Sequence, residues 1–335
     1  MSETPEMSAK DSAATTGMSG AGAYDANSMP QRDALGDQAA RIRRAVRELP
    51  GTGAELRLMD YGCGPGRNSV AVMRIALEEV LATGAGKPVV TVHSDQIGNA
   101  WGDLFTTLRG PDSYLGGDAD PRVEISVGSF FQTRASPSVV DFGMCFAAAH
   151  WLSRSVAMPS PGALFFCDLP EPARGAVAEL AARDWAGFLR ARDGELRPGG
   201  WMVMDMLSSA PDPDDPSGVQ AAGNGLYRAL WQVADDMARE GRIDRTTLDR
   251  FVFPVYFRLP DEVRAPFESD PDLRAAFEVV DMVNENLPFP IGEMLRATGD
   301  AAAYAEAYTG FCPRLLRGDP ARSALRAFIA GRDGD

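Results

Sequence analysis

The chain has few of the residues that build disulfide frameworks and zinc sites. Its four cysteines are far apart and form no C-x-x-C pair: Cys63, Cys145, Cys167 and Cys312. This spacing argues against a disulfide scaffold or a zinc site, so we interpret all four as packing residues. Only two histidines are present, His93 and His150. His93 lies within a predicted strand, and we assign it no function.

Positive charge and long apolar runs are scarce as well. The sequence holds 33 Lys and Arg against 47 Asp and Glu, a net charge of −14. Such a balance disfavours nucleic acids and anionic membranes as partners. No apolar run approaches membrane-spanning length and no apolar signal peptide leads the chain, so we expect a cytoplasmic protein. Its 335 residues suffice for one large α/β domain with a smaller inserted or appended one.

The chain does contain a glycine-rich turn between an apolar run and a helical pattern. The stretch from Glu55 to Asn68 reads E-L-R-L-M-D-Y-G-C-G-P-G-R-N. The apolar run ends at Asp60, and apolar residues then recur at helical spacing from Val70 to Leu81. Strand, glycine turn and helix form the first unit of a doubly wound sheet, in which ligands bind at the carboxyl ends of the strands.

This turn favours a cationic ligand over a dinucleotide. The backbone at Gly62, Gly64 and Gly66 can approach a ligand closely because glycine has no Cβ atom. The dinucleotide fingerprint G-x-G-x-x-G requires a glycine where the chain has Arg67, and a pyrophosphate disfavours a carboxylate such as Asp60. S-adenosylmethionine, which carries an ammonium and a sulfonium but no phosphate, fits the turn. A glycine turn that only connects a strand to a helix is the alternative.

Strands and helices alternate after the turn, which predicts a parallel sheet. Further strands are expected at residues 88–93, 123–127, 139–149 and 201–207. Helices are expected at residues 33–49, 98–108 and 176–192. We predict a disordered N-terminus (1–23), a ligand-binding α/β domain (24–210), a helical cap (211–275) and a C-terminal return to the sheet (276–335). The last part would hold a sixth strand at Phe277–Val283 and two helices, and Pro211–Pro216 would be a linker.

Polar and aromatic residues follow the ends of three predicted strands. Asp95 is placed to accept hydrogen bonds from ribose hydroxyls, or to cap the next helix. Ser129 and Phe130 offer an adenine one hydrogen bond and one stacking face, although such a phenylalanine is more often a core residue. His150 and Trp151 follow the fourth strand, where a lone histidine beside an aromatic ring is more often packed than catalytic.

The order and spacing of these motifs resemble the SABATH family of class I S-adenosylmethionine-dependent methyltransferases, which are small-molecule carboxyl and N-methyltransferases. The stretches that carry the resemblance include D-Y-G-C-G-P-G at 60–66, Y-D-A-N-S-M-P-Q at 24–31, S-D-Q-I-G-N-A-W-G-D-L-F at 94–105, G-S-F-F at 128–131, A-H-W-L-S at 149–153 and F-P-V-Y-F-R-L-P-D-E-V at 253–263. The resemblance implies a doubly wound Rossmann-like α/β sheet under a mainly helical cap. It also implies a homodimer that acts on a small aromatic or isoprenoid acid.

The resemblance further implies which residues contact the ligands. Those expected at S-adenosylmethionine are Tyr24, Ser28, Asp60, Gly62, Asn68, Asp95, Gln96, Ser129 and Phe130. Those expected to hold the reacting group of the substrate are Gln31, His150 and Trp151, with Tyr227 and Tyr256 shaping the pocket. An asparagine associated with a metal in some relatives has no clear counterpart, so we predict no metal. Ala147 replaces an aromatic residue of the family, which implies a roomier pocket.

Methyl transfer to a carboxylate needs no general base, because the ionised acid is already a nucleophile. The enzyme must instead desolvate and aim it, using donors such as the Gln31 amide and the Trp151 indole. His150 would donate a third bond, or orient a ring nitrogen if the acceptor is nitrogen. An N- or C-methyltransferase acting on an indole-like heteroaromatic is thus an alternative. A catalytically silent binding module and a nicotinamide oxidoreductase are two others, the last disfavoured by Arg67 and Asp60.

Overall fold

The computed structural model describes residues 29–84, 86–156, 158–214, 218–285 and 290–311. The N-terminus that we expect to be disordered, and the predicted cofactor residues Tyr24 and Ser28, lie outside these ranges. Within them, no helix combines bilayer-spanning length with an apolar sequence.

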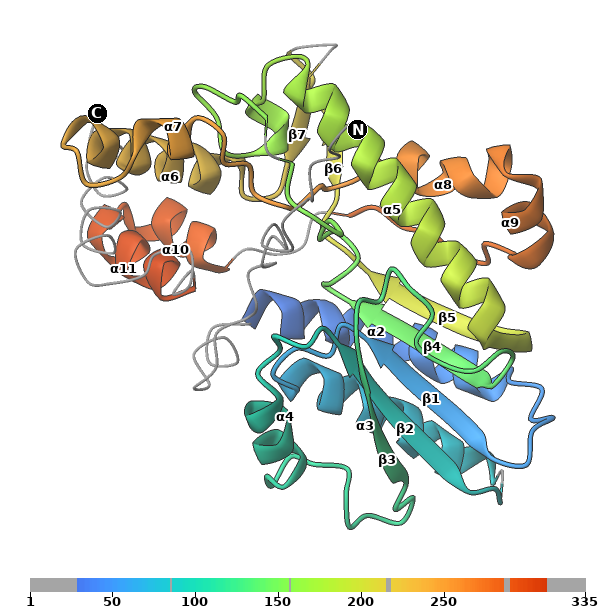
Figure 1. The fold of residues 1–335 in the computed structure, drawn as a ribbon. Coiled ribbons are helices and arrows are strands. Elements are labelled where there is room, and N and C mark those ends of the chain that lie inside the picture. The colour runs from blue at the N-terminus through green and yellow to red at the C-terminus, as the bar shows by residue number, and fades with distance from the viewer. Residues whose placement is uncertain (1–28, 85, 157, 215–217, 286–289, 312–335) are drawn as a thin grey trace, which may run out of the picture.

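Five parallel strands form the central sheet (Figure 1). In chain order they are β1 (Leu56–Tyr61), β2 (Val89–Asp95), β3 (Arg122–Val127), β4 (Val140–Phe146) and β5 (Leu196–Asp205). Their order across the sheet is β3-β2-β1-β4-β5, so the progression of the chain reverses between β1 and β4. Ligands bind at such a switch point in doubly wound sheets, and the predicted fold class is confirmed.

Helices cover both faces of the sheet (Figure 1). Three of them share one core with the sheet: α2 (Met29–Arg47), α3 (Arg67–Thr83) and α4 (Trp101–Leu108). Helix α3 buries Val70, Met73, Leu77 and Val80, the apolar positions that repeat at helical spacing. The opposite face packs against α5 (Ala173–Glu195), whose Trp185, Phe188 and Leu189 are buried there.

The chain leaves the sheet at the end of β5 and enters the cap. Because all five strands are parallel, their carboxyl ends point the same way, toward this second body (Figure 1). The cap contains a short antiparallel pair, β6 (Ser209–Pro211) and β7 (Val219–Ala221), and the helices α6 (Asn224–Arg239) and α7 (Arg245–Leu248). The predicted linker at Pro211–Pro216 therefore begins inside a strand.

The two C-terminal helices that we predict are present, as α10 (Pro290–Thr298) and α11 (Ala301–Phe311). Tyr304 and Ala305 of α11 pack with Leu226 and Leu230 of α6 in one apolar cluster. Helix α11 thus completes the core of the cap rather than returning to the sheet.

Two helices in the stretch predicted as the cap (211–275) lie against α5 instead of the cap core. They are α8 (Pro260–Ser269) and α9 (Pro271–Ala276), and a 3₁₀ turn (Phe166–Asp168) lies at the other end of α5. Leu273 and Phe267 share the core between α5 and the sheet.

The prediction of a sixth strand at Phe277–Val283 is wrong. This segment does not form a strand, and Val279, Val280 and Val283 are exposed. Asp281 forms an ion pair with Arg41 of α2 at 2.7 Å instead. Residues with high strand propensity form a strand only where a neighbouring edge pairs with them, and no described strand does so here.

Candidate active site

The glycine turn adopts backbone angles that favour glycine at three positions. The φ angles of Gly62, Gly64 and Gly66 are 95°, 55° and 105°. A Cβ atom on Gly62 would lie 2.4 Å from the Cβ of Ala148 and 3.6 Å from the ring of Phe130. The turn after β1 is therefore in close contact with the segments that follow β3 and β4.

Asp95, at the end of β2, is hydrogen-bonded directly to this turn. One carboxylate oxygen accepts a hydrogen bond from the amide of Gly64 and the other from the amide of Gln96, both at 2.7 Å. Asn99 donates from its side chain to the carbonyl of Gly64 at 2.8 Å. These contacts bring the predicted residues Gly62, Asp95 and Gln96 together at one edge of the sheet.

The interior of the candidate site contains two desolvated acids. Burial raises the pKa of Asp60 to about 7, with a further contribution from the nearby charge of Asp95 and an opposing hydrogen bond from Ser69. Burial also raises the pKa of Asp95, although the amides of Gly64 and Gln96 oppose the shift. No Lys or Arg among the described residues contributes to either shift. A cationic ligand would supply the missing counter-charge.

Two polar atoms beside the turn have no partner among the described residues. Oδ1 of Asn68, in the first turn of α3, and Oγ of Ser94, at the end of β2, are buried without a hydrogen bond. Buried polar atoms are rarely left unpaired, and those in a binding site often await a ligand. Together with the buried acids, they fit the ammonium-bearing, phosphate-free cofactor that the sequence predicts.

The loop that carries Ser129 and Phe130 is held from below by a buried ion pair. Nε of Arg192 donates to Glu195 at 2.9 Å, and its other nitrogens donate to the carbonyls of Phe130 and Gln132 at 2.8 and 3.1 Å. Glu195 also accepts from the hydroxyl of Tyr61 at 2.6 Å. The loop is therefore anchored through its backbone, which leaves Phe130 half-buried beside Gly62.

His150 is buried behind the end of β4 and is uncharged. Burial and the nearby charge of Arg258 lower the pKa of His150 to about 3. Its Nδ1 accepts a hydrogen bond from the amide of Leu207 at 3.3 Å. A neutral imidazole that accepts at Nδ1 carries its proton on Nε2, so this side of the ring is a donor.

Arg258 is itself buried and holds the backbone around His150. It donates to the carbonyl of Ala149 at 2.9 Å and to that of Ala181 at 2.8 Å. Burial lowers its pKa to about 10, so the guanidinium remains positive at neutral pH. The segment around His150 therefore has a fixed positive charge behind a neutral donor.

The cap approaches the sheet next to His150. Tyr256 donates its amide to the carbonyl of His150 at 2.8 Å, and Trp151 forms a β-bridge with Val255. The ring of Trp151 lies 6.2 Å from that of His150, centroid to centroid. The hydroxyl of Tyr256 donates a hydrogen bond to Glu262 at 2.7 Å, so this side chain is anchored to α8.

Tyr227 and Gln31 complete the predicted set. Tyr227 stacks on Phe165 with ring centroids 4.0 Å apart. It also lines a cavity of about 280 Å³ with Trp231 and the Arg228–Asp168 ion pair. Gln31 lies in the first turn of α2, and its side chain is outside the described part of the structure. In the described ranges, no group of three His, Cys, Asp or Glu side chains is arranged to hold a metal.

Several residues that shape the site were not found from the sequence. Asn99 holds the glycine turn, Arg192 and Glu195 anchor the Phe130 loop, and the charge of Arg258 adds to burial in lowering the pKa of His150. All four stand inside stretches that carry the family resemblance, Arg192 and Glu195 in F-L-R-A-R-D-G-E-L-R-P-G-G at 188–200, and this was the one available signal. Their contacts join residues far apart in the sequence, and no local pattern encodes those contacts.

Comparison with known proteins agrees with this geometry. Residues 10–283 match a family model described as SAM dependent carboxyl methyltransferase. The chain is 27% identical over 220 residues to indole-3-acetate O-methyltransferase 1 of Arabidopsis thaliana, with 59% of this chain and 56% of that protein covered. It is 24% identical over 248 residues to gibberellic acid methyltransferase 1 of the same plant, with 67% and 64% covered. The matches thus span less than two thirds of these relatives.

A solved structure shows the same fold. Loganic acid methyltransferase with SAH superimposes with a TM-score of 0.73 at 19% identity, over 94% of this chain and 91% of that one. The five-stranded sheet, its switch point and the family match over most of the sequence lead to one conclusion. The chain belongs to the SAM-dependent carboxyl methyltransferase family, the family that its motifs resemble.

Proposed function

We propose that this protein transfers a methyl group from S-adenosylmethionine to the carboxylate of a small apolar or aromatic acid, forming a methyl ester. The observation that carries the proposal is the state of His150. This residue is a buried neutral donor with Arg258 behind it, which suits an anionic acceptor and does not suit a general base at neutral pH.

The acceptor side would work by positioning and desolvation. The Nε2–H of His150 and the indole N–H of Trp151 are donors to carboxylate oxygens, and the amide of Gln31 is a third. None of them removes a proton, and none is needed to do so. Hydrogen bonds of this kind hold one oxygen toward the donor methyl while the cap excludes water.

The cofactor side would be formed by the residues around the glycine turn. In this proposal Asp60 lies near the methionyl end, Asp95 accepts from the ribose hydroxyls, and Phe130 stacks on the adenine. The other proposed contacts are Tyr24, Ser28, Gly62, Asn68, Gln96 and Ser129. The bound cofactor would supply an electrophilic methyl group. The buried acids and the unpaired Oδ1 of Asn68 support this assignment.

The substrate would occupy the space between the end of β4 and the cap, with Tyr227 and Tyr256 shaping its pocket. Ala147 has a φ of 50° and no large side chain, which favours a roomy pocket beside His150. Two relatives named for methylating indole-3-acetate and gibberellic acid support an acid as the acceptor. The family resemblance also supports a homodimer, which light scattering would test.

A methyl-transfer screen tests the proposal. The full chain is incubated with cofactor labelled in the methyl group and with aromatic, isoprenoid and fatty acids, with indoles as nitrogen or carbon acceptors. A methyl ester releases its label under mild alkali, whereas N-methyl and C-methyl products keep it. We expect alkali-labile label on at least one acid. Alkali-stable label on an indole alone would establish the alternative function, and binding of NAD instead of S-adenosylhomocysteine in calorimetry would overturn both.

A further inference from the structure

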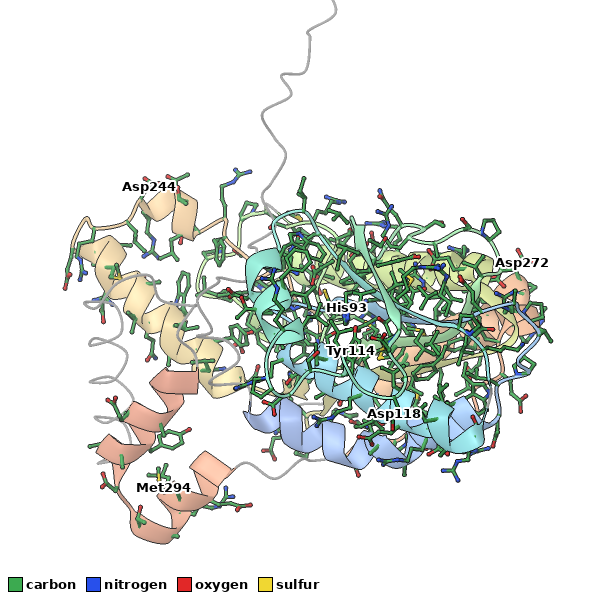
Figure 2. All side chains as sticks on the ribbon, turned by 90° about the horizontal axis from the view of Figure 1, so that it is seen from below. His93, Tyr114, Asp118, Asp244, Asp272 and Met294 are labelled. Carbon is green, nitrogen blue, oxygen red and sulfur yellow. The ribbon has the colours of Figure 1, made fainter. Side chains whose placement is uncertain are left out.

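A chain of hydrogen bonds runs through the core between the sheet and α3. Nδ1 of His93 lies 2.8 Å from the hydroxyl of Ser69, and Nε2 lies 2.8 Å from the hydroxyl of Tyr114. The Tyr114 hydroxyl is 2.9 Å from that of Thr91. At the other end, a hydrogen bond from Ser69 lowers the pKa of Asp60. Figure 2 shows His93 and Tyr114 next to each other inside the sheet domain.

The sheet register places the two titratable ends of this chain side by side. Asp60 on β1 is the register partner of His93 on β2, so their side chains point to the same face of the sheet. Ser69 of α3 bridges them from above, directly after the glycine turn. The hydrogen bonds therefore connect the carboxylate beneath the proposed cofactor site to groups deep in the core.

An ionised Asp60 sets the direction of every hydrogen bond in the chain. A carboxylate only accepts, so Ser69 must donate to it and accept from His93. His93 then carries its proton on Nδ1, and its bare Nε2 accepts from Tyr114. A protonated Asp60 can instead donate to Ser69, and the direction then reverses, with the His93 proton on Nε2.

The ordinary explanation is a histidine whose hydrogen bonds are satisfied within the core. Burial alone lowers the pKa of His93 to about 4, so the ring is neutral, as that explanation requires. The side chains in the hydrogen-bonded chain are all buried: Asp60, Ser69, Thr91, His93 and Tyr114. An apolar residue would fill the position of His93 without needing hydrogen-bond partners. That explanation does not account for the position of Asp60, which ends the chain of hydrogen bonds beneath the glycine turn.

We propose that His93 is a positioning residue of the cofactor site, which acts through Ser69 to keep Asp60 an acceptor aimed at the cationic end of the cofactor. When Asp60 takes up a proton, the hydrogen bonds reverse and the site loses its preference for a cation. This inference rests on the proposed function, because it assumes that Asp60 faces S-adenosylmethionine.

The other titratable groups around Asp60 do not supply this effect. Asp95 on β2 has the same charge, and the thiols of Cys63 in the turn and Cys145 on β4 are buried with their pKa values raised by burial. Burial also raises the pKa of Tyr114, so its hydroxyl is protonated at neutral pH. Among the described residues, the hydrogen bond from Ser69 is the one influence that lowers the pKa of Asp60.

The first test reads the proton position directly. The chain has only two histidines, so protein labelled with ¹⁵N-histidine gives two imidazole spin systems, assigned with His93→Asn. With S-adenosylhomocysteine bound at pH 8, we expect His93 in the Nδ1–H form and His150 in the Nε2–H form. In the free protein at pH 5.5 we expect His93 to change to Nε2–H. An Nε2–H form of His93 under both conditions would overturn the inference without any variant.

The second test compares two variants that each keep one half of the ring's contacts. Asparagine places an amide near Nδ1 and glutamine places one near Nε2, so His93→Asn preserves the contact with Ser69 and His93→Gln does not. We expect His93→Gln and Ser69→Ala to weaken S-adenosylhomocysteine binding at pH 7 about tenfold, the usual scale for a hydrogen bond to a charged group. We expect the pH of half-maximal binding to rise by about one unit. His93→Asn should stay within about threefold of the wild type.

The outcomes separate this inference from the proposed function. If the wild type binds S-adenosylhomocysteine and methylates an acid while Ser69→Ala binds equally well at every pH, only the role of His93 is lost. Equal loss in His93→Asn and His93→Gln would indicate a purely structural role for the ring. If the wild type itself does not bind S-adenosylhomocysteine, the proposed function fails first.

Discussion

Gly62 and Ala148 approach so closely that a Cβ atom on the glycine would lie 2.4 Å from the Cβ of the alanine. Gly62 belongs to the turn after β1, and Ala148 lies two residues before His150. This contact joins the two halves of the proposed site, the turn for the cofactor and the segment for the acceptor. The distance between the bound cofactor and the bound substrate would therefore depend on Gly62 having no side chain.

Gly62→Ala should disrupt both halves together. The φ of Gly62 is 95°, which strains any other residue, and the added methyl group collides with Ala148. We expect a loss of about 2 kcal/mol or more in the free energy of unfolding, and a larger loss of S-adenosylhomocysteine affinity. Gly98→Ala is the matched control, because a Cβ there meets nothing within 4 Å and its φ is not in the left-handed region. Equal melting temperatures for the two variants would contradict the argument.

Asp95→Ala should weaken cofactor binding with little effect on folding. The substitution removes the acceptor proposed for the ribose and frees the amide of Gly64. We expect a loss of about 1–3 kcal/mol in S-adenosylhomocysteine binding by calorimetry. Asp118→Ala removes an exposed acid on the loop before β3 and serves as the control for net charge. Affinity unchanged from the wild type would remove Asp95 from the site.

Trp151→Phe should separate the acceptor side from the cofactor side. The ring is kept but the indole donor is lost, so turnover on an acid should fall about tenfold. Affinity for S-adenosylhomocysteine should stay within about twofold, since the indole is not among the proposed cofactor contacts. Steady-state kinetics on the best acid from the screen, with calorimetry in parallel, measure both quantities. A loss confined to cofactor affinity would reverse the assignment.

His150 should act as a donor rather than a base. Because its pKa is lowered to about 3, the turnover of an acid between pH 6 and 9 should show no inflection from this residue. His150→Gln keeps a donor near Nε2 and should retain most activity, whereas His150→Ala should lose about tenfold or more. A step near pH 6.5 together with an inactive glutamine variant would indicate a base and favour the nitrogen or carbon acceptor.

Asp60 should make the cofactor-free protein less stable as the pH rises. Its pKa is raised from 3.8 to about 7, so the folded state holds a proton that the unfolded state has lost between these values. The contribution of Asp60 to the free energy of unfolding therefore falls between about pH 4 and pH 7 and stays constant above pH 7. Asp60→Asn should remove this slope and be more stable than the wild type at pH 8, on the order of 2–4 kcal/mol.

Urea unfolding of both proteins at pH 5 and pH 8 measures the difference. The comparison with Asp60→Asn isolates this residue from other titrating groups such as His93, whose pKa is lowered and whose slope has the opposite sign. Parallel pH profiles for the two proteins would show that Asp60 ionises normally.

Local patterns in the sequence were sufficient for the elements of the sheet and for the residues at their ends. The glycines after β1 and the apolar periodicity of α3 predict their own conformations, because both depend on neighbouring residues. The pattern fails at Phe277–Val283, where strand formation depends on a partner that local sequence does not specify. Local sequence patterns also do not show that α11 packs on α6.

The candidate site also has some features that local sequence predicts and others that it does not. The positions of Gly62, Asp95, Phe130 and His150 at one edge of the sheet could be predicted, because the carboxyl ends of parallel strands meet at one edge. Whether His150 is a base or a donor could not be known, since that depends first on its burial. It also depends on the amide of Leu207 and the charge of Arg258, which are 57 and 108 residues away in the chain.

By itself, the sequence determined the five strands of the sheet, the helices between them, the glycine turn and the acid that precedes it, because these follow from local backbone preferences and apolar spacing. Only the tertiary structure decided the protonation of the polar groups and the hydrogen bonds between them. Examples are the neutral ring of His150, the raised pKa of Asp60 and the hydrogen bonds of His93. The physical reason is that burial and charge act through space, between residues that the chain brings together only when it folds.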